Sequence, residues 1–410
     1  MENLEKKVLE EIENLKESCI SEFVEILKIP AISPEYGGEG EYKKAEKILQ
    51  ILKKSYKFDS IKVISTKDKY KKQRPNILAF YNGKTKRKFW IIAHMDVVPI
   101  GNEKEWKSKP FEPVIKDGKI FARGALDNGQ AIAATLLAIK AIMKLEIKPK
   151  TTIAIAFLSD EETGSNYGLK FLIKKHRQLF SKNDFALVPD AGNEEGTMIE
   201  IAEKSILWLK IKIKGKEAHA STPENGINAH RIGMQYALAL DELLHKKYKL
   251  TQKPFSSAST FEPTMVKNSA SSPNILPGEH EIVFDCRILP RYKIEEVLKD
   301  AKNLAKKFEK RIKGVKIEFE EISAQKAPKP TSEKSRIVKE LKKAIKELRG
   351  KEAFITGIGG GTFARYLREI GIPAVVWATG CEVEHQPNEY CRIKDIVEDA
   401  KVMALLMLRV

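Results

Sequence analysis

The sequence predicts an α/β protein whose main domain has a mostly parallel sheet and is interrupted by a smaller inserted domain. Three observations point there: apolar strand-like runs alternate with helical patterns, several of those runs are apolar almost throughout, and the pattern changes near residue 206. Strands that alternate with helices are typical of parallel sheets, and continuously apolar strands belong to sheets covered on both faces. The length of 410 residues suits two or three domains.

The first part of the chain supplies the helices and strands of the main domain. Apolar spacing predicts helices over residues 4–27 and Tyr42–Tyr56, and a buried helix over Asp127–Leu145. Strands are expected at residues 61–65, 76–82, 89–96, 151–160 and 185–192. Near the end of the chain we expect a helix at 335–348, a glycine-rich stretch at 356–362, a strand at 373–380 and a helix at 393–408.

The segment between these two parts has a different pattern. Residues 206–215 alternate apolar and basic side chains, as a half-exposed strand does. The elements expected after that strand are a helix at Asn228–Lys247, strands near 256–266 and 280–289, a helix at Ile294–Arg311 and a strand at 315–323. This β-α-β-β-α-β order is ferredoxin-like. We therefore expect a main domain formed by residues 1–204 and 323–410, with residues 205–322 inserted.

The charge and the cysteines limit the functional classes. A net charge of +17 can indicate nucleic acid or an anionic membrane as a partner. Only 14 of the 73 basic residues are Arg, however, and a Lys-rich surface favours solvation over phosphate recognition. No apolar run approaches the ~20 residues of a membrane span. The four cysteines are scattered without a Cys-x-x-Cys pair, which favours reduced thiols in the cytoplasm.

Histidines and carboxylates follow the expected strands one after another. They are His94, Asp96, Asp127, Asp160, Glu161, Glu162, Asp190 and His385. An isolated His-x-Asp is more often a core histidine beside a solvated aspartate, and a run of acids is often a solvated loop. Three acids that end an apolar strand nevertheless repel one another, and a bound cation would offset that repulsion.

Together these residues offer more ligands than one catalytic zinc can use. Two His and three carboxylates suit two metals that share one carboxylate, and a further carboxylate is left as a general base. Adjacent glutamates in an extended segment point in opposite directions, so one of Glu161 and Glu162 can bind metal while the other faces water.

The motifs HMDVVP, ARGALD, SDEETGS, VPDAG and EHQPNE occur in this order. Over nearly its whole length the chain resembles the aminoacylase / acetylornithine deacetylase / succinyl-diaminopimelate desuccinylase / glutamate carboxypeptidase family of dizinc metallopeptidases. The resemblance implies that His94 and Asp190 hold one metal, that Glu162 and His385 hold the other, and that Asp127 bridges the two.

The resemblance also implies catalytic and substrate-binding roles. Glu161 would be the general base, and Asp96 would sit behind the metal-binding His94. The inserted domain would be a lid that commonly forms a dimer interface. In the lid, His219 would polarise the scissile carbonyl in a neighbouring subunit's site, and Arg287 and Asn274 would bind a substrate carboxylate. Alternatively, His219 is an ordinary surface histidine and Arg287 is a solvated arginine.

Two departures from the family pattern leave the substrate class open. Asn128-Gly129-Gln130 follows Asp127 where the family often has x-Lys-Gly. Asp190 stands where deacetylases, desuccinylases and carboxypeptidases commonly have Glu and several di- and tripeptidases have Asp.

The expected function is hydrolysis of an amide bond in a small N-acyl amino acid or short peptide by a metal-bridged hydroxide. A deacylase of the acetylornithine deacetylase / succinyl-diaminopimelate desuccinylase type is the first hypothesis. A di- or aminopeptidase is the alternative, and a non-catalytic binding protein is the more remote one. We expect two divalent metals per subunit, zinc first and cobalt or manganese as alternatives. A homodimer through the lid is expected, with no nucleic-acid or membrane partner.

Overall fold

The chain divides into two units in the computed structural model, which describes residues 2–410. The first unit contains the described chain up to Ile201, together with Pro330–Ile355 and Thr362–Val410. The second unit contains Ala202–Lys329 and Thr356–Gly361. The range 205–322 that the sequence suggested for an insertion lies within the longer segment of the second unit.

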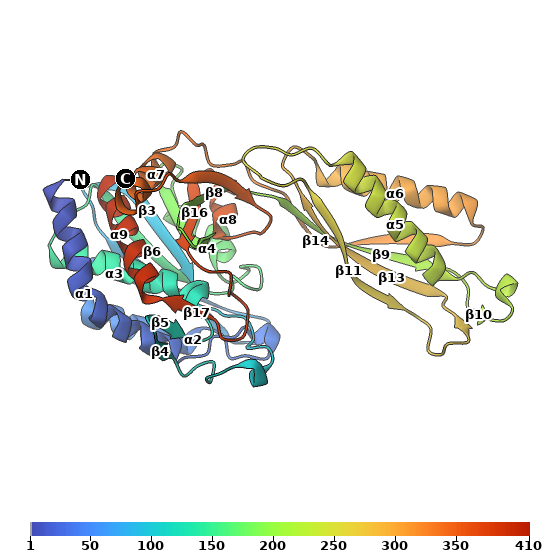
Figure 1. The fold of residues 1–410 in the computed structure, drawn as a ribbon, viewed down its shortest axis with the longest axis horizontal. Coiled ribbons are helices and arrows are strands. Elements are labelled where there is room, and N and C mark those ends of the chain that lie inside the picture. The colour runs from blue at the N-terminus through green and yellow to red at the C-terminus, as the bar shows by residue number, and fades with distance from the viewer. Residues whose placement is uncertain (1) are drawn as a thin grey trace. The chain divides into compact units, whose positions relative to one another are not determined.

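Eight strands form one large sheet in the order β1-β2-β6-β3-β7-β16-β8-β15 (Figure 1). The central strands β6, β3, β7 and β16 run parallel, and β1, β2 and β8 pair antiparallel with their neighbours. This confirms the α/β class with a largely parallel sheet. The strands are β1 (Ser60–Lys67), β2 (Gln73–Tyr81), β3 (Thr85–His94), β6 (Thr151–Leu158), β7 (Phe185–Asn193), β8 (Met198–Glu203), β15 (Phe354–Ile358) and β16 (Ala374–Thr379).

Helices cover both faces of this sheet, and all of β6 is buried between them. On one face α1 (Asn3–Leu27), α3 (Ala131–Lys144) and α9 (Ile393–Arg409) pack against one another (Figure 1). On the other face α4 (Leu169–Lys175) and α8 (Phe363–Glu369) join Trp90 and Ile92 in one apolar core. The remaining elements of this unit are α2 (Tyr42–Ser55), α7 (Arg336–Arg349) and a small sheet of β4 (Val114–Lys116), β5 (Lys119–Phe121) and β17 (Tyr390–Arg392).

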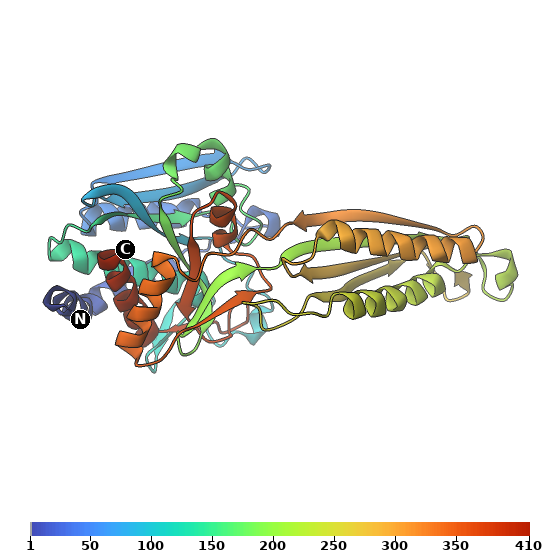
Figure 2. The ribbon, with the colours of Figure 1, turned by 90° about the horizontal axis from the view of Figure 1, so that it is seen from above.

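The second unit has the expected β-α-β-β-α-β order. Its antiparallel sheet has the strand order β11-β13-β9-β14, and α5 and α6 lie side by side along it (Figure 2). The elements are β9 (Ser205–Lys214), α5 (Ala229–Lys247), β11 (Thr260–Asn268), β13 (Glu279–Ile288), α6 (Ile294–Arg311), β14 (Lys316–Gln325) and the short pair β10 (Ala218–His219) and β12 (Ile275–Leu276). The alternating pattern of β9 is confirmed, because from Leu207 onward buried apolar side chains alternate with more exposed ones, most of them lysines. The inserted ferredoxin-like fold is thus observed.

The predicted start of the third helix at Asp127 is wrong. The regular helix α3 begins at Ala131, and Asp127 has φ −110° and ψ 98°, outside the helical region. The backbone N–H groups of Leu126 and Asp127 donate to the carboxylate of Glu389. A side chain distant in sequence therefore fixes the N–H groups of Leu126 and Asp127. The apolar periodicity of the helix cannot predict this contact.

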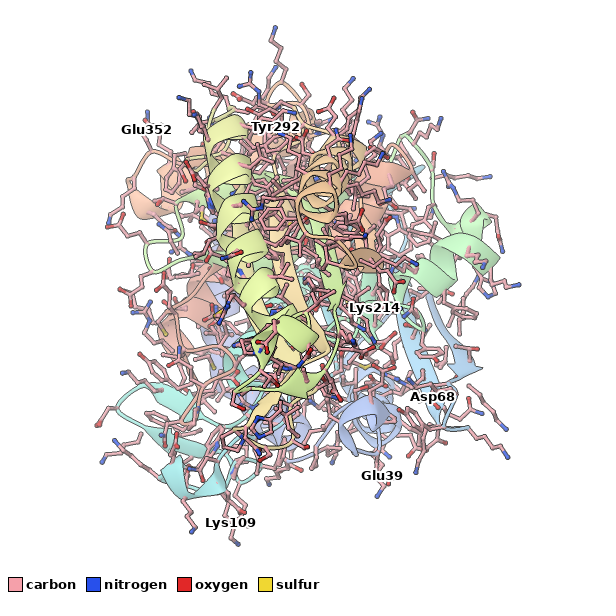
Figure 3. The ribbon with its side chains drawn as sticks, turned by 90° about the vertical axis from the view of Figure 1, so that its right-hand side faces the viewer. Glu39, Asp68, Lys109, Lys214, Tyr292 and Glu352 are labelled. Carbon is pink, nitrogen blue, oxygen red and sulfur yellow. The ribbon has the colours of Figure 1, made fainter. Side chains whose placement is uncertain are left out.

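Charged side chains dominate the surface. Those of Glu39, Lys109 and Glu352 extend outward from the ribbon in Figure 3, and all three are mostly exposed. Among the helices formed by residues 2–410, none has the length and apolar character to cross a bilayer.

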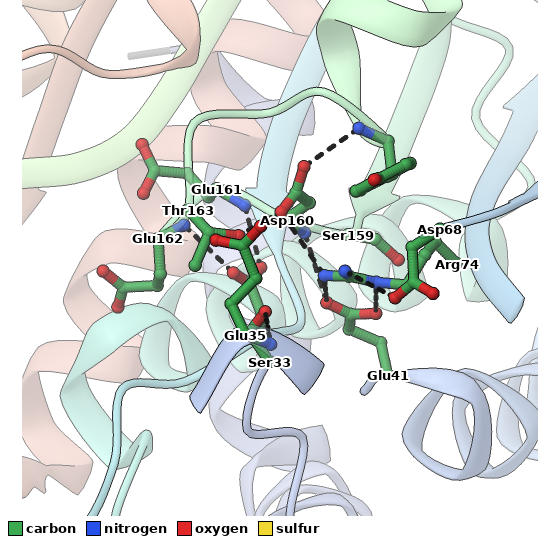
Figure 4. Close-up of polar contacts among 12 residues, drawn as sticks. Ser33, Glu35, Glu41, Asp68, Arg74, Ser159, Asp160, Glu161, Glu162 and Thr163 are labelled. Carbon is green, nitrogen blue, oxygen red and sulfur yellow. Dashed lines mark hydrogen bonds and ion pairs between the residues drawn. The ribbon is translucent and has the colours of Figure 1, made fainter. Parts of the chain in front are cut away.

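One buried ion cluster fixes the loop that carries the run of three acids. Arg74 on β2 is completely buried and donates to both carboxylate oxygens of Glu41, at 2.7 and 2.6 Å. The same guanidinium lies 3.4 Å from Asp68 and 3.4 Å from Asp160, as Figure 4 shows. Asp160, the first acid after β6, therefore shares a fixed cation with Glu41 and Asp68, and its carboxylate also accepts a hydrogen bond from the backbone N–H of Tyr167 at 2.9 Å.

We predict that Arg74→Met destabilises the protein by about 3–5 kcal/mol, because it leaves the buried carboxylate of Glu41 without its partner. Lys72→Met is the matched control, since Lys72 pairs with Glu39 at 2.6 Å on the surface. Lys72→Met should lower the free energy of unfolding by only about 0–1 kcal/mol. Urea unfolding measures both free energies, and equal losses in the two variants would contradict the role of the buried cluster.

Candidate metal centre

Five candidate ligands come from separate loops at one edge of the large sheet. His94 ends β3, Glu162 follows β6, Asp190 lies near the end of β7, His385 follows β16, and Asp127 precedes α3. The carboxyl ends of parallel strands meet at the same edge, so residues distant in sequence come together there. All five belong to the first unit.

Asp127 lies between the two histidines. Its Oδ1 is 2.8 Å from His94 Nε2, and its Oδ2 is 2.9 Å from His385 Nε2. One carboxylate thus presents one oxygen to each histidine, which is the arrangement that a bridging ligand requires.

A further carboxylate completes a group of three on each side. Asp190 Oδ1 lies 3.4 Å from His94 Nε2, and Glu162 Oε1 lies 3.3 Å from His385 Nε2. Within each group of three, ligand atoms lie within 4.8 Å of one another. The groups share Asp127 and differ in exposure, because the side chain of His94 is 2% exposed and that of His385 is 51% exposed.

Asp96 has two contacts that the sequence did not reveal. Its backbone carbonyl lies 3.0 Å from His94 Nδ1, whereas its carboxylate is 3.6 Å from that nitrogen. The carboxylate instead accepts hydrogen bonds from the backbone N–H groups of Glu161 and Glu162, at 3.1 and 3.0 Å. The carbonyl accepts a hydrogen bond from the Nδ1–H group of His94, and Nε2 is directed at Asp127. The Asp96 side chain thus positions the loop of residues 160–162, which carries the three consecutive acids.

The electrostatics show that this cluster attracts positive charge. Hydrogen bonds to Asp127 and Glu162 raise the pKa of His385 to about 10. Burial would lower the pKa of His94, but its contacts with three carboxylates raise it well above the ordinary value. Burial and the charge of Asp127 raise the pKa of Glu162 to about 7. Without a metal, the cluster therefore holds protons where it would otherwise carry excess negative charge.

The donor set fits divalent cations. Glu162 Oε1 is buried, and its 3.3 Å contact with His385 Nε2 leaves it a lone pair with no other partner among the described residues. Imidazole nitrogen together with carboxylate oxygen is a set that zinc, cobalt and manganese all accept. Glu161, the preceding residue, has its pKa raised well above the ordinary value, first by burial and then by the charge of Asp190.

Asn128 is a site residue that the sequence reasoning missed. Its Nδ2 donates to Asp190 Oδ1 at 2.8 Å and to the Pro189 carbonyl at 2.9 Å, and its Oδ1 accepts the His94 backbone N–H at 3.4 Å. It therefore links two ligand-bearing strands. Its only sequence signal is its place directly after Asp127.

The three expected substrate-binding residues lie in the second unit. His219 is exposed, and its Nδ1 accepts the Ser221 backbone N–H at 3.1 Å, which leaves Nε2 to carry the ring proton. Asn274 is exposed, and its Oδ1 accepts the Ser272 hydroxyl at 2.6 Å. The Arg287 guanidinium is already engaged by both carboxylate oxygens of Asp285, at 2.6 and 2.9 Å.

Two similar proteins extend over almost the whole chain. An uncharacterized metallohydrolase of Methanocaldococcus jannaschii is 43% identical over 403 residues, covering 95% of this chain and 98% of that protein. A succinyl-diaminopimelate desuccinylase of Pelagibacter ubique is 25% identical over 386 residues, covering 93% of this chain and 96% of that protein.

The fold is shared with solved structures. Human carnosine dipeptidase 1 has a TM-score of 0.77 at 17% identity, with 100% of this chain and 99% of that chain covered. At this level of identity the likeness concerns the fold alone. The model of peptidase family M20/M25/M40 matches residues 90–409, which is more than half of the chain. The protein is therefore a metallohydrolase of the peptidase family M20/M25/M40.

Proposed function

We propose that the protein hydrolyses the amide bond of a small N-acyl amino acid, with a short peptide as the alternative substrate. The observation that carries this proposal is Asp127, with one carboxylate oxygen toward each of two histidines, beside the raised-pKa carboxyl of Glu161. This arrangement suits two co-catalytic metals and a nearby base.

The ligand roles proposed are those expected from the sequence. His94 and Asp190 hold one metal, Glu162 and His385 hold the other, and Asp127 is shared. A pair of bound divalent metal ions would supply Lewis acidity to the substrate carbonyl and would lower the pKa of water enough for attack at neutral pH. Zinc is the first choice, because catalytic zinc sites combine these ligand types.

Glu161 is the proposed general base. Its carboxylate takes a proton from the attacking water and delivers it to the leaving amine nitrogen. Asp96 holds the Glu161 backbone N–H at 3.1 Å, so the base is positioned from the same segment that carries His94. His219 of a neighbouring subunit is the proposed donor to the scissile carbonyl, through the Nε2 proton that its contact with Ser221 leaves in place.

The deacylase hypothesis has its support in the desuccinylase relative. The peptidase alternative has its support in Asp190, because the family resemblance associates Asp at this position with di- and tripeptidases. The four buried cysteines are all free thiols, which supports the proposed cytoplasmic location.

We predict that Glu161→Gln lowers turnover by about a hundredfold to ten-thousandfold while metal stays bound, because only proton transfer is removed. His94→Ala is the matched control, and it should lose metal because it removes a ligand. Elemental analysis and steady-state kinetics measure the two effects. Activity within about tenfold of wild type in Glu161→Gln, roughly 1.4 kcal/mol in the barrier, would remove Glu161 from the role of base.

A substrate panel tests the function. The metal-free protein is supplied with zinc or cobalt and assayed on N-acetylornithine, N-succinyl-diaminopimelate and several dipeptides. We expect release of amine from at least one N-acyl amino acid. Turnover of dipeptides alone would favour the peptidase alternative, and the absence of turnover on every member would contradict the proposed function.

A homodimer through the second unit is also proposed. The edge strand β11 pairs only with β13, and its Met265 and Val266 are 67% and 66% exposed. An exposed apolar strand edge is a ready site for association.

We predict that the protein has twice the chain mass of 46.4 kDa in solution and that Val266→Lys shifts it toward the monomer. Val63→Lys is the control, because Val63 is 47% exposed on the edge strand β1 of the large sheet. Light scattering after gel filtration measures the mass. A monomeric wild type, or a dimeric Val266→Lys variant, would contradict this interface.

A further inference from the structure

A second buried ion pair lies among the loops that carry the candidate ligands. The carboxylate of Glu389, which is 1% exposed, accepts the backbone N–H of Gly124 at 3.0 Å, of Leu126 at 2.9 Å and of Asp127 at 3.0 Å. It also accepts a hydrogen bond from the guanidinium of Arg123 at 2.7 Å. Four donors on one carboxylate therefore fix the short segment that ends at the shared ligand.

Arg123 connects the same segment to two further loops. It is 1% exposed, and its guanidinium donates to the carbonyl of Pro99 at 3.1 Å, of Gln386 at 3.3 Å and of His385 at 3.4 Å. Pro99 lies in the loop that follows His94, and Gln386 follows the other ligand histidine. One guanidinium thus joins the backbones on both sides of the centre.

The segment enters a distorted helical turn, Ala125–Gln130, rather than a regular α-helix. Asp127 is not helical, and Gly124 has φ +77°, a conformation that favours glycine. A β-carbon at Gly124 would lie 2.5 Å from Val97 Cγ1, in the loop after His94. The position of Asp127 is therefore determined by its contacts with neighbouring loops.

We propose that Glu389 and Arg123 are positioning residues that hold Asp127 between His94 and His385. This rests on the proposed function only through the role of Asp127 as shared ligand. Neither residue offers a free lone pair to a metal: the Glu389 oxygens are occupied by N–H donors, and arginine has no acceptor. They act through the backbone of Asp127, and partners outside the ligand set commonly tune metal affinity about 10–100-fold.

The test variant is Glu389→Gln, which keeps the size of the side chain but removes the charge and replaces one acceptor oxygen with an NH2 donor. We expect its affinity for zinc, measured by calorimetric titration of the metal-free protein, to fall about 10–100-fold. Arg123→Lys keeps the positive charge but loses the fork geometry, and it should weaken binding in the same direction.

The matched control is Glu200→Gln. Glu200 is buried and receives two bonds of 2.9 Å from Arg368, so its loss removes a similar buried charge pair. These residues lie on β8 and α8, which carry none of the proposed ligands. We expect Glu200→Gln to lose thermal stability as Glu389→Gln does, while its zinc affinity stays within about threefold of wild type.

The outcomes separate positioning from general stability. Zinc affinity in Glu389→Gln equal to wild type would overturn the proposal, and so would equal weakening in Glu200→Gln. If Glu389→Gln does not fold, Arg123→Lys with unchanged affinity would overturn it. No substrate is present in these titrations, so failure of the proposed reaction does not affect them. A wild-type protein that binds no metal would instead contradict the proposed function itself.

Discussion

Carboxylates crowd one edge of the large sheet, and each of them needs a positive charge or a hydrogen-bond donor to be stable there. The molecule uses two kinds of partner. Arg74 and Arg123, which carry a charge at every accessible pH, neutralise Glu41 and Glu389. The carboxylates of Asp127, Asp190 and Glu162 instead lie against histidines, whose charge is exchangeable. The two arginines thus stabilise the loops around the site permanently. The carboxylates that lie against histidines are those where a metal cation could replace the proton.

The same carboxylates also shape the backbone. Asp96 accepts two consecutive N–H groups of the acidic loop, and Glu389 accepts three from the loop before α3. In both cases an acid from one loop fixes a segment that carries another acid. The geometry of the centre is therefore set by bonds between loops, and the strands provide the points from which those loops depart.

The sequence revealed those features whose signal is local. The strands ending at His94 and near Glu162 have apolar runs that identify them, and β9 shows its alternation directly. Arg74 could not be recognised as buried, because its partner Glu41 lies 33 positions away. The sequence pattern predicts helix at Asp127, because the apolar pattern of α3 extends toward the N-terminus beyond Ala131. The N–H groups of Leu126 and Asp127 instead donate to Glu389. The motifs predicted the ligand set, but the contacts of Asp96 and Asn128 needed three-dimensional neighbours.

The order of the strands in the large sheet bears on how the protein is made. β16 lies between β7 and β8, although at least 170 residues separate it from either of them along the chain. On the ribosome, β7 and β8 emerge before β16, and the place between them stays empty until Ala374–Thr379 has been synthesised. The second unit, most of which is one continuous segment, can fold during that interval. His385 follows β16, so the candidate metal centre cannot form before β16 is made, and a nascent chain that stops short of it carries an incomplete set of candidate ligands.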